Sequence, residues 1–215
     1  KAHDKKAGEF KELLKKVNAA LGEAIPARGQ GLTEEQKASL YDAHLLTMKP
    51  VIYVANVAES EAADASANPY VQKLTEYVQK EGAQMVTISA KIEADIAEMD
   101  KAEAKEYLDM MGLKEAGLDR LIKAGFKLLG LQTFLTAGEM ESRAWTINIG
   151  MKAPQAAGKI HTDFERGFIK AEIVSYKDLV ACGSKAAARD KGLVRMEGKD
   201  YVMQDGDVVE FGFNV

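Results

Sequence analysis

Two short polar segments in this sequence each follow an apolar run. Asn56–Glu59 comes directly after the run 50–55, and Ser89–Lys91 comes directly after the run 85–88. Amide, hydroxyl and carboxylate groups at neighbouring strand ends can hydrogen-bond to the edge of a ligand, and paired segments of this kind commonly read a nucleotide base. The pattern therefore predicts half of a nucleotide site, the half that selects the base.

The half that holds phosphates has no counterpart in the sequence. Backbone N–H groups of a G-x-x-x-x-G-K-[ST] loop normally cradle phosphates, and this pattern does not occur in the 215 residues. The single cysteine, Cys182, and the three histidines do not stand at spacings typical of an activated nucleophile or a zinc site. We therefore assign no catalytic residue and no metal ligand.

A strand–helix–strand unit is expected to position the two segments. Between the apolar runs, Asn68-Pro69 supplies a cap and a first-turn proline for a helix that Gly82 closes. Strands joined through a helix run parallel, so their carboxyl ends meet at one edge of a sheet. Further helices are expected over 92–99, 101–111 and 115–129.

Two helices are expected ahead of this unit. Apolar residues recur at helical spacing over 8–21, and Pro26 interrupts the pattern. Thr33–Gln36 forms a capping box that begins a second helix running toward Thr47. The tight connection makes the two helices an antiparallel hairpin. This hairpin is either a helical pair that only packs on the domain or an arm that binds a partner.

The sequence changes character after residue 131. Thr162–Glu165 has the pattern of a second capping box, at the head of a helix that begins near Asp163. A helix on a small mixed sheet describes an α+β roll of the ubiquitin-like type, which by architecture is a binding module. Strands are expected over 145–149, 169–174, 194–196, 201–203 and 208–213, with a turn at 205–206.

Composition limits the class of protein. With 47% hydrophobic and 29% charged residues, the chain is expected to be soluble and globular. No apolar stretch approaches the roughly 18 residues of a membrane span, and a lone cysteine is typical of a reducing, cytoplasmic compartment. A net charge of −4 excludes recognition of nucleic acid by overall charge, so any RNA contact has to use a local patch.

Four stretches of the chain carry a specific resemblance. They are LTMKPVIYVANVAE at 46–59, RAWTI at 143–147, APQAAGKIHTDFE at 153–165 and EGKDYVMQDGDV at 197–208. In this order they resemble the YchF family of Obg-related ATPases, over essentially the whole chain. The resemblance implies the rear of a helical hairpin at 1–48, the last part of a P-loop GTPase-like, doubly wound α/β domain at 49–130, and a TGS domain of the β-grasp, ubiquitin-like α+β type at 131–215.

The resemblance also implies a function. A full-length family member would carry the phosphate loop, the magnesium ligands and the catalytic switch region before Lys1. This chain is then expected to select a base without hydrolysing the nucleotide. The implied cofactor is ATP or GTP, with Mg only in the intact protein, and the implied setting is a cytoplasmic, translation-linked, ribosome-associated ATPase that is a monomer.

The first segment departs from the guanine-reading motif Asn-Lys-x-Asp of usual GTPases. Val57 stands where the lysine would pack along the base, and Glu59 is one methylene longer than the aspartate. A longer carboxylate weakens the fork that holds the two guanine donors, so discrimination for guanine is lost. We expect Asn56 to read the base, Val57 to touch the ring face and Glu59 to lie at the rim.

The second segment is expected to complete the base site. Ser89 and Ala90 would aim backbone N–H groups at the base edge, and Lys91 would cover the base or the sugar with its stem. Read alone, Asn56 is also typical of a turn that ends a strand, and Ser89 of a helix N-cap.

A basic cluster offers an alternative function. Lys185, Arg189, Lys191 and Arg195 are either a phosphate-contacting patch or a solvated face. In the first case the TGS domain would be a non-enzymatic module that binds RNA or the ribosome.

Overall fold

The computed structural model describes residues 2–138 and 141–214. The chain divides into two compact units, Lys1–Ala124 and Gly125–Val215, both of which mix helices and strands. The finer division into three parts at residues 48 and 130 stays a prediction. Within the described ranges, no helix has both the length and the apolar character needed to span a bilayer.

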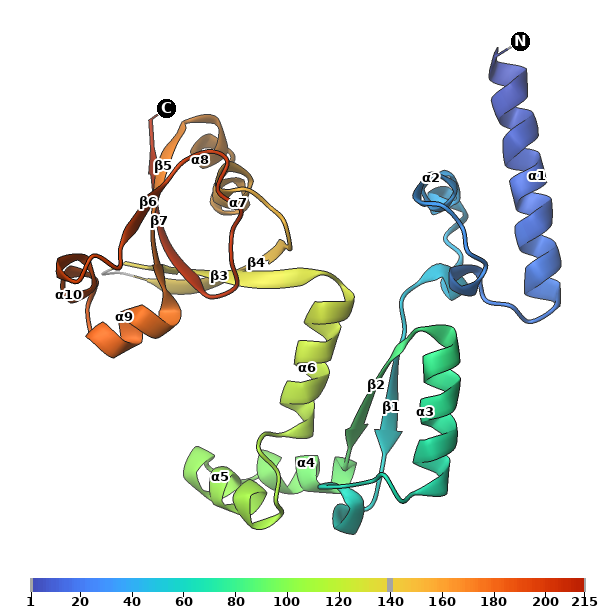
Figure 1. Ribbon diagram of the computed structural model, residues 1–215, viewed down its shortest axis with the longest axis horizontal. Coiled ribbons are helices and arrows are strands. Elements are labelled where there is room, and N and C mark those ends of the chain that lie inside the picture. The colour runs from blue at the N-terminus through green and yellow to red at the C-terminus, as the bar shows by residue number, and fades with distance from the viewer. Residues whose placement is uncertain (1, 139–140, 215) are drawn as a thin grey trace. The chain divides into compact units, whose positions relative to one another are not determined.

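The first unit is built around two parallel strands. Its helix α6 runs on past the unit boundary at Ala124 (Figure 1). The elements are α1 (Ala2–Gly22), α2 (Glu34–Ser39), β1 (Ile52–Asn56), α3 (Pro69–Glu81), β2 (Gln84–Ile88), α4 (Ala90–Ala97), α5 (Lys101–Met110) and α6 (Gly117–Leu128), with single 3₁₀ turns at Ala27–Gly29, Tyr41–Ala43, Leu46–Met48 and Glu59–Glu61.

The predicted strand–helix–strand unit is confirmed. β1 and β2 pair in parallel, with Asn56 opposite Ile88 at their carboxyl ends. The side chain of Asn68 accepts hydrogen bonds from the backbone of the first turn of α3, and Gly82 ends that helix at φ 68°. A left-handed residue at this position costs little only for glycine, which is why the glycine marks the helix end so clearly.

The second helix is shorter than predicted. Its capping box is present, because Thr33 Oγ1 accepts from the N–H of Gln36 and Gln36 Oε1 accepts from the N–H of Thr33. The helix ends at Ser39, however, and does not run toward Thr47. Leu40 follows and is only 1% exposed, packed in an apolar cluster with Val17 and Leu32. Burial of this one side chain diverts the chain into 3₁₀ turns.

The second unit contains a five-stranded mixed sheet in the order β4-β3-β7-β5-β6. β3 and β7 are parallel neighbours, and the other pairs are antiparallel. The elements are β3 (Leu131–Ala137), β4 (Ser142–Asn148), α7 (Ala153–Ile160), α8 (Thr162–Arg166), β5 (Phe168–Ser175), α9 (Tyr176–Cys182), α10 (Lys185–Asp190), β6 (Arg195–Glu197) and β7 (Asp207–Phe213).

Helices cover the sheet in two groups, α7 with α8 and α9 with α10 (Figure 1). The main core lies under α7, where Phe134, Ile147 and Ile173 are at most 1% exposed. A smaller cluster around Val174 and Ala188 lies under α9 and α10. The sequence predicted only the α8 helix, from the pattern at Thr162–Glu165, because the other three helices lack long apolar periodicity.

Two local predictions in this unit are wrong. Thr162 is not a cap: it is the first residue of α8, and His161 caps the helix by accepting from the N–H of Asp163 at 3.2 Å through Nδ1. Residues 201–203 form no strand but only a single bridge between Val202 and Lys152. A side chain, Gln132 Nε2, donates to the Met203 carbonyl at 2.7 Å, so that carbonyl needs no strand partner.

Candidate functional site

The structure brings the two predicted base-reading segments together. Asn56 is the last residue of β1, and its Oδ1 accepts a hydrogen bond of 2.9 Å from the backbone N–H of Ala90, the first residue of α4. Both residues are exposed. The first N–H groups of a helix have no acceptor within it, so the Asn56 amide satisfies a donor that would otherwise need water. The strand end and the helix start thus form one polar surface.

This bond corrects one expectation. We expected the N–H of Ala90 to face the base, but it is already engaged by Asn56. The parallel ladder continues one residue past β1, since the N–H of Val57 donates to the Ile88 carbonyl at 2.9 Å. That register brings the Asn56 side chain to the start of α4.

Val57 and Ser89 are both buried beneath this surface. Val57 is 9% exposed, which leaves little of it for contact with a ring. Ser89 is 3% exposed and occupies the N-cap position of α4 without capping it. Its Oγ has no hydrogen-bond partner anywhere in residues 2–138 and 141–214. A buried hydroxyl without a partner carries an energetic cost that a ligand can remove.

Lys91 is held by a neighbour on its own helix. Its Nζ lies 2.5 Å and 2.7 Å from the two carboxylate oxygens of Asp95, and this hydrogen bonding raises the pKa of the lysine. Tyr107 of α5 is 3.5 Å from the same carboxylate, and burial together with the charges of Asp95 and Glu59 raises the pKa of the phenol. The ammonium is therefore paired with Asp95, and the Lys91 stem is the part best placed to cover a base.

Sequence reasoning missed Asp95 and Tyr107. The Lys91–Asp95 pair has the i, i+4 spacing of a helical ion pair and was open to prediction. Tyr107 reaches the site only through the packing of α5 against α4, for which the sequence carries no local signal.

The predicted basic cluster does not form one free patch. Lys185 is paired with Glu210 and lies 3.5 Å from Glu172, and Arg189 donates to Glu172 at 2.7 Å. Their charges are balanced by carboxylates on the sheet, which favours the solvated, ion-paired face over a phosphate-binding one. Lys191 is exposed at the end of α10.

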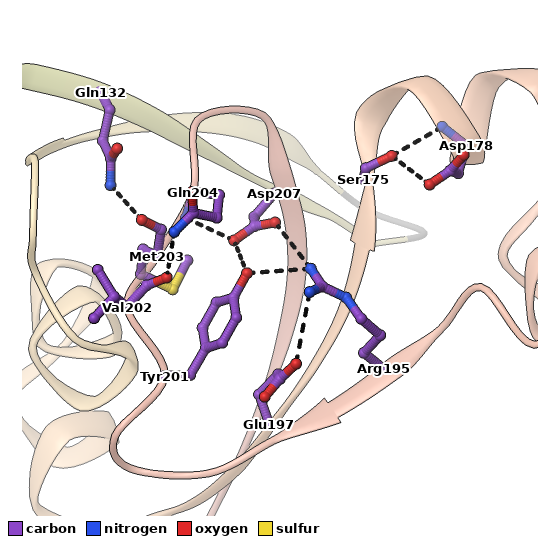
Figure 2. Close-up of polar contacts among 10 residues, drawn as sticks. All are labelled: Gln132, Ser175, Asp178, Arg195, Glu197, Tyr201, Val202, Met203, Gln204 and Asp207. Carbon is purple, nitrogen blue, oxygen red and sulfur yellow. Dashed lines mark hydrogen bonds and ion pairs between the residues drawn. The ribbon is translucent and has the colours of Figure 1, made fainter.

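Arg195 belongs to a separate cluster in the same unit (Figure 2). Its guanidinium donates to the hydroxyl of Tyr201 at 3.1 Å and lies 3.6 Å from Asp207 and 3.7 Å from Glu197. Asp207 is 2% exposed and accepts from Tyr201 as well. Arg195 is therefore engaged with the buried carboxylate of Asp207.

Magnesium does not fit the residues present. Over the part of the chain that the structure describes, no three His, Cys, Asp or Glu side chains gather in an arrangement able to hold a metal ion.

Comparison with known proteins gives consistent matches. The family model YchF-GTPase_C, described as a protein of unknown function (DUF933), matches residues 131–214. The "Ribosome-binding ATPase YchF" of Bacillus subtilis (strain 168) is 53% identical over the whole chain, which covers 59% of that relative. The protein of the same name from Escherichia coli O157:H7 is 46% identical over the whole chain, which covers 58% of it.

A solved structure agrees with the sequence matches. The YchF GTPase of Schizosaccharomyces pombe superposes with a TM-score of 0.80 at 33% identity, over 97% of this chain and 55% of that one. The chain thus spans a little over half the length of the relatives it matches.

Proposed function

The chain belongs to the YchF family, and on this premise we propose that its Asn56–Glu59 and Ser89–Lys91 loops select the base of a nucleotide in a ribosome-binding ATPase. The observation that carries the proposal is the Asn56–Ala90 hydrogen bond at the carboxyl ends of two parallel strands. Ligands of open α/β sheets bind at this edge.

The surface offers a defined set of groups to a base. Asn56 Oδ1 is occupied by Ala90, so the amide presents its N–H donors outward. The exposed Glu59 adds a carboxylate, and the Ser89 Oγ, without a partner in the described residues, lies buried beneath this surface. Lys91 contributes its stem, because its ammonium stays with Asp95. Val57 gives the smallest contribution, through the 9% of it that is exposed.

ATP is the nucleotide we propose, with GTP as a weaker ligand. A guanine base brings two adjacent donors that usual GTPases satisfy with an aspartate, and this chain has Glu59 at that position on an exposed 3₁₀ turn. Unsatisfied donors penalise guanine, whereas adenine has no donor pair at that edge.

The second unit is, in our proposal, a TGS domain of the β-grasp type that contacts the ribosome. Support comes from its sheet, in which the parallel neighbours β3 and β7 lie inside the order β4-β3-β7-β5-β6 with α7 packed on the main core. The relatives from Bacillus subtilis and Escherichia coli are ribosome-binding ATPases by name, which supports the ribosome as partner. We propose a cytoplasmic, monomeric setting for the protein.

Hydrolysis is proposed for the longer family proteins and not for these residues alone. Attack of water on the γ-phosphate needs groups that neutralise charge on the phosphates, and the sequence contains no loop of the phosphate-cradling pattern. The chain by itself is therefore expected to bind nucleotide with millimolar affinity and to show no ATPase activity.

Calorimetric titration of the chain with ATP and with GTP tests the proposal. We expect ATP to bind at least as tightly as GTP, and Asn56→Ala to abolish binding, while Asn18→Ala on the exposed surface of α1 leaves it unchanged. A preference for GTP of tenfold or more, or full binding by Asn56→Ala, would contradict the proposed role of the loops. Micromolar affinity would contradict the expected weakness.

A further inference from the structure

The start of α4 is connected to a second helix by one acidic side chain. The carbonyl of Ser89 accepts from the N–H of Glu93, one turn further along α4, at 3.1 Å. The Glu93 carboxylate then accepts from the N–H of Gly117 at 2.7 Å and from the N–H of Leu118 at 3.1 Å. These are the first two residues of α6. Glu93 thus caps α6 from another helix, with both of its oxygens.

The contact is close as well as bidentate. A methyl group at Gly117 would lie 2.8 Å from Glu93 Oε1 and 2.9 Å from Ile88 Cγ2, so only glycine allows this approach. Ile88 is the last residue of β2 and precedes Ser89 directly. The end of β2 and the start of α4 are therefore both in close contact with the first turn of α6.

A carboxylate at this position should respond strongly to a displacement of the base loop. Unpaired N–H groups and the helix dipole favour a negative charge at a helix N-terminus, and the interaction falls off steeply with distance. Glu93 is fixed to Ser89 through the backbone, so a displacement of the base loop changes both of its hydrogen bonds to α6. α6 is also the element by which the chain passes from the first unit into the second.

We propose that Glu93 is a positioning residue through which nucleotide bound at Asn56 and Ser89 is sensed at the first turn of α6. The inference rests on the proposed base-selecting function and adds to it a defined route of coupling. Because the proposed coupling ends at α6, its test follows the response of α6 to ligand.

The experiment is a titration of the ¹⁵N-labelled chain with ATP, followed by amide chemical shifts. In the natural chain we expect the signals of Asn56 and Ala90 to move, and those of Gly117 and Leu118 to move with the same dissociation constant. In Glu93→Gln a single carbonyl oxygen replaces the two acceptors. We expect Asn56 and Ala90 to respond as before and the shifts at Gly117 and Leu118 to fall at least threefold.

A matched control is Glu98→Gln, at the other end of the same helix and exposed. This variant should leave the responses of Asn56, Ala90, Gly117 and Leu118 unchanged. A general loosening of α4 would instead change them. Glu93→Asp keeps the charge but shortens the side chain, and we expect a response at Gly117 and Leu118 between those of the natural chain and Glu93→Gln.

The outcomes separate the inference from the function beneath it. If Asn56 and Ala90 move in the natural chain while Gly117 and Leu118 stay still, the coupling is overturned and the base site stands. If Glu93→Gln leaves the α6 response intact, the role of Glu93 is overturned. If no signal moves at millimolar ATP, both proposals fail. The titration of the natural chain tests the coupling even if Glu93→Gln does not fold.

Discussion

Each of the two units holds a tyrosine, a carboxylate and an arginine in contact, and the two clusters are bonded in different ways. In the first unit, Tyr53 donates to Glu81 Oε2 at 2.5 Å, and Arg28 donates to Glu81 Oε1 at 2.9 Å and 2.5 Å. In this cluster the arginine, Arg28, contacts the carboxylate of Glu81 directly. In the second unit the arginine, Arg195, donates to the tyrosine hydroxyl, and the carboxylate is Asp207.

The clusters also differ in what they join. Arg28 lies in the 3₁₀ turn after α1 and donates to the Thr47 carbonyl at 3.1 Å, whereas Glu81 ends α3 and Tyr53 lies in β1. These residues are distant in the sequence, so the cluster attaches the N-terminal helical segment to the strand–helix–strand unit.

The second cluster is local and rests on the backbone. Asp207 Oδ2 accepts from Tyr201 at 2.8 Å and also from the N–H of Gln204 at 2.9 Å (Figure 2). The loop is anchored further by Gln132, and the core beside it is tightly filled. The first cluster therefore joins distant segments through a direct ion pair, whereas in the second cluster the guanidinium lies 3.6 Å from Asp207 and the carboxylate is held mainly by hydrogen bonds within one loop.

The largest effect is expected from Glu81→Gln. Its side chain is 9% exposed and that of Arg28 is 24% exposed, so removal of the charge leaves a half-buried guanidinium without its partner. We expect the free energy of opening of residues 27–48 to fall by about 3 kcal/mol, the lower end for a broken buried pair, because Arg28 keeps some water. Amide hydrogen exchange of that segment measures it.

Glu76→Gln is the control for this change, since Glu76 is exposed on the same helix. Exchange in 27–48 should rise roughly a hundredfold in Glu81→Gln and stay constant in Glu76→Gln. Equal exchange in the two variants would mean that the ion pair does not hold the N-terminal segment.

A smaller effect is expected from Asp207→Asn, the same chemical change in the second cluster. The new amide oxygen still accepts from Tyr201 and from the Gln204 backbone, and Arg195 loses a carboxylate 3.6 Å away but keeps its bond to Tyr201, so the loss should be about 1 kcal/mol. Trp145 is the only tryptophan and packs against the core of this unit, so its fluorescence in urea reports the unfolding. A loss as large as that of Glu81→Gln would remove the distinction between the clusters.

The smallest effect is a pH dependence that the first cluster should show at the alkaline end. The hydrogen bond to Glu81 raises the pKa of Tyr53 from 10.0 to about 12. A tyrosine whose pKa is raised on folding stabilises the protein fully below its ordinary pKa, and this contribution is lost as the pH rises through the folded value. Amide exchange of 27–48 should therefore accelerate between pH 10 and 12, after correction for the intrinsic rate.

Tyr53→Phe tests the assignment of that change. The variant should lack the acceleration, and its tyrosinate absorbance near pH 12 should be smaller by the contribution of Tyr53. The same Glu81 carboxylate should make the stability of the first unit depend on pH at the acid end of the range as well. Its pKa is lowered by Tyr53 and then by Arg28, so its contribution is present above the ordinary carboxyl pKa and lost as the pH falls through the lowered value. An alkaline transition that survives in Tyr53→Phe would assign it to another group.

The elements that the sequence predicted are those decided by local chemistry. Asn68-Pro69 and Gly82 bound α3 because a cap, a fixed φ and a left-handed glycine act within a few residues. The extension of α2 toward Thr47 failed because burial of Leu40 against Val17 and Leu32 is a tertiary event. His161 replaced Thr162 as a cap because an imidazole nitrogen also accepts, a use that residue preference does not reveal.

The predictions for the site divide in the same way: local features were predicted from the sequence, and tertiary contacts were not. The strand ends at Asn56 and Ser89 were located from the apolar runs alone. The occupied N–H of Ala90 was not foreseen, because it depends on the register of two strands. The Glu93 cap of α6 joins residues 24 positions apart on two different helices. Neither local sequence carries a signature of this contact.

Base selection by the two loops is tested most directly by locating adenine on the chain through intermolecular nuclear Overhauser effects at millimolar ATP. We predict contacts from the adenine H2 or H8 proton to the Asn56 side-chain amide and the Ala90 methyl group, lost in Asn56→Ala. Adenine contacts confined to another surface of the chain, with none at Asn56 or Ala90, would contradict this role of the loops.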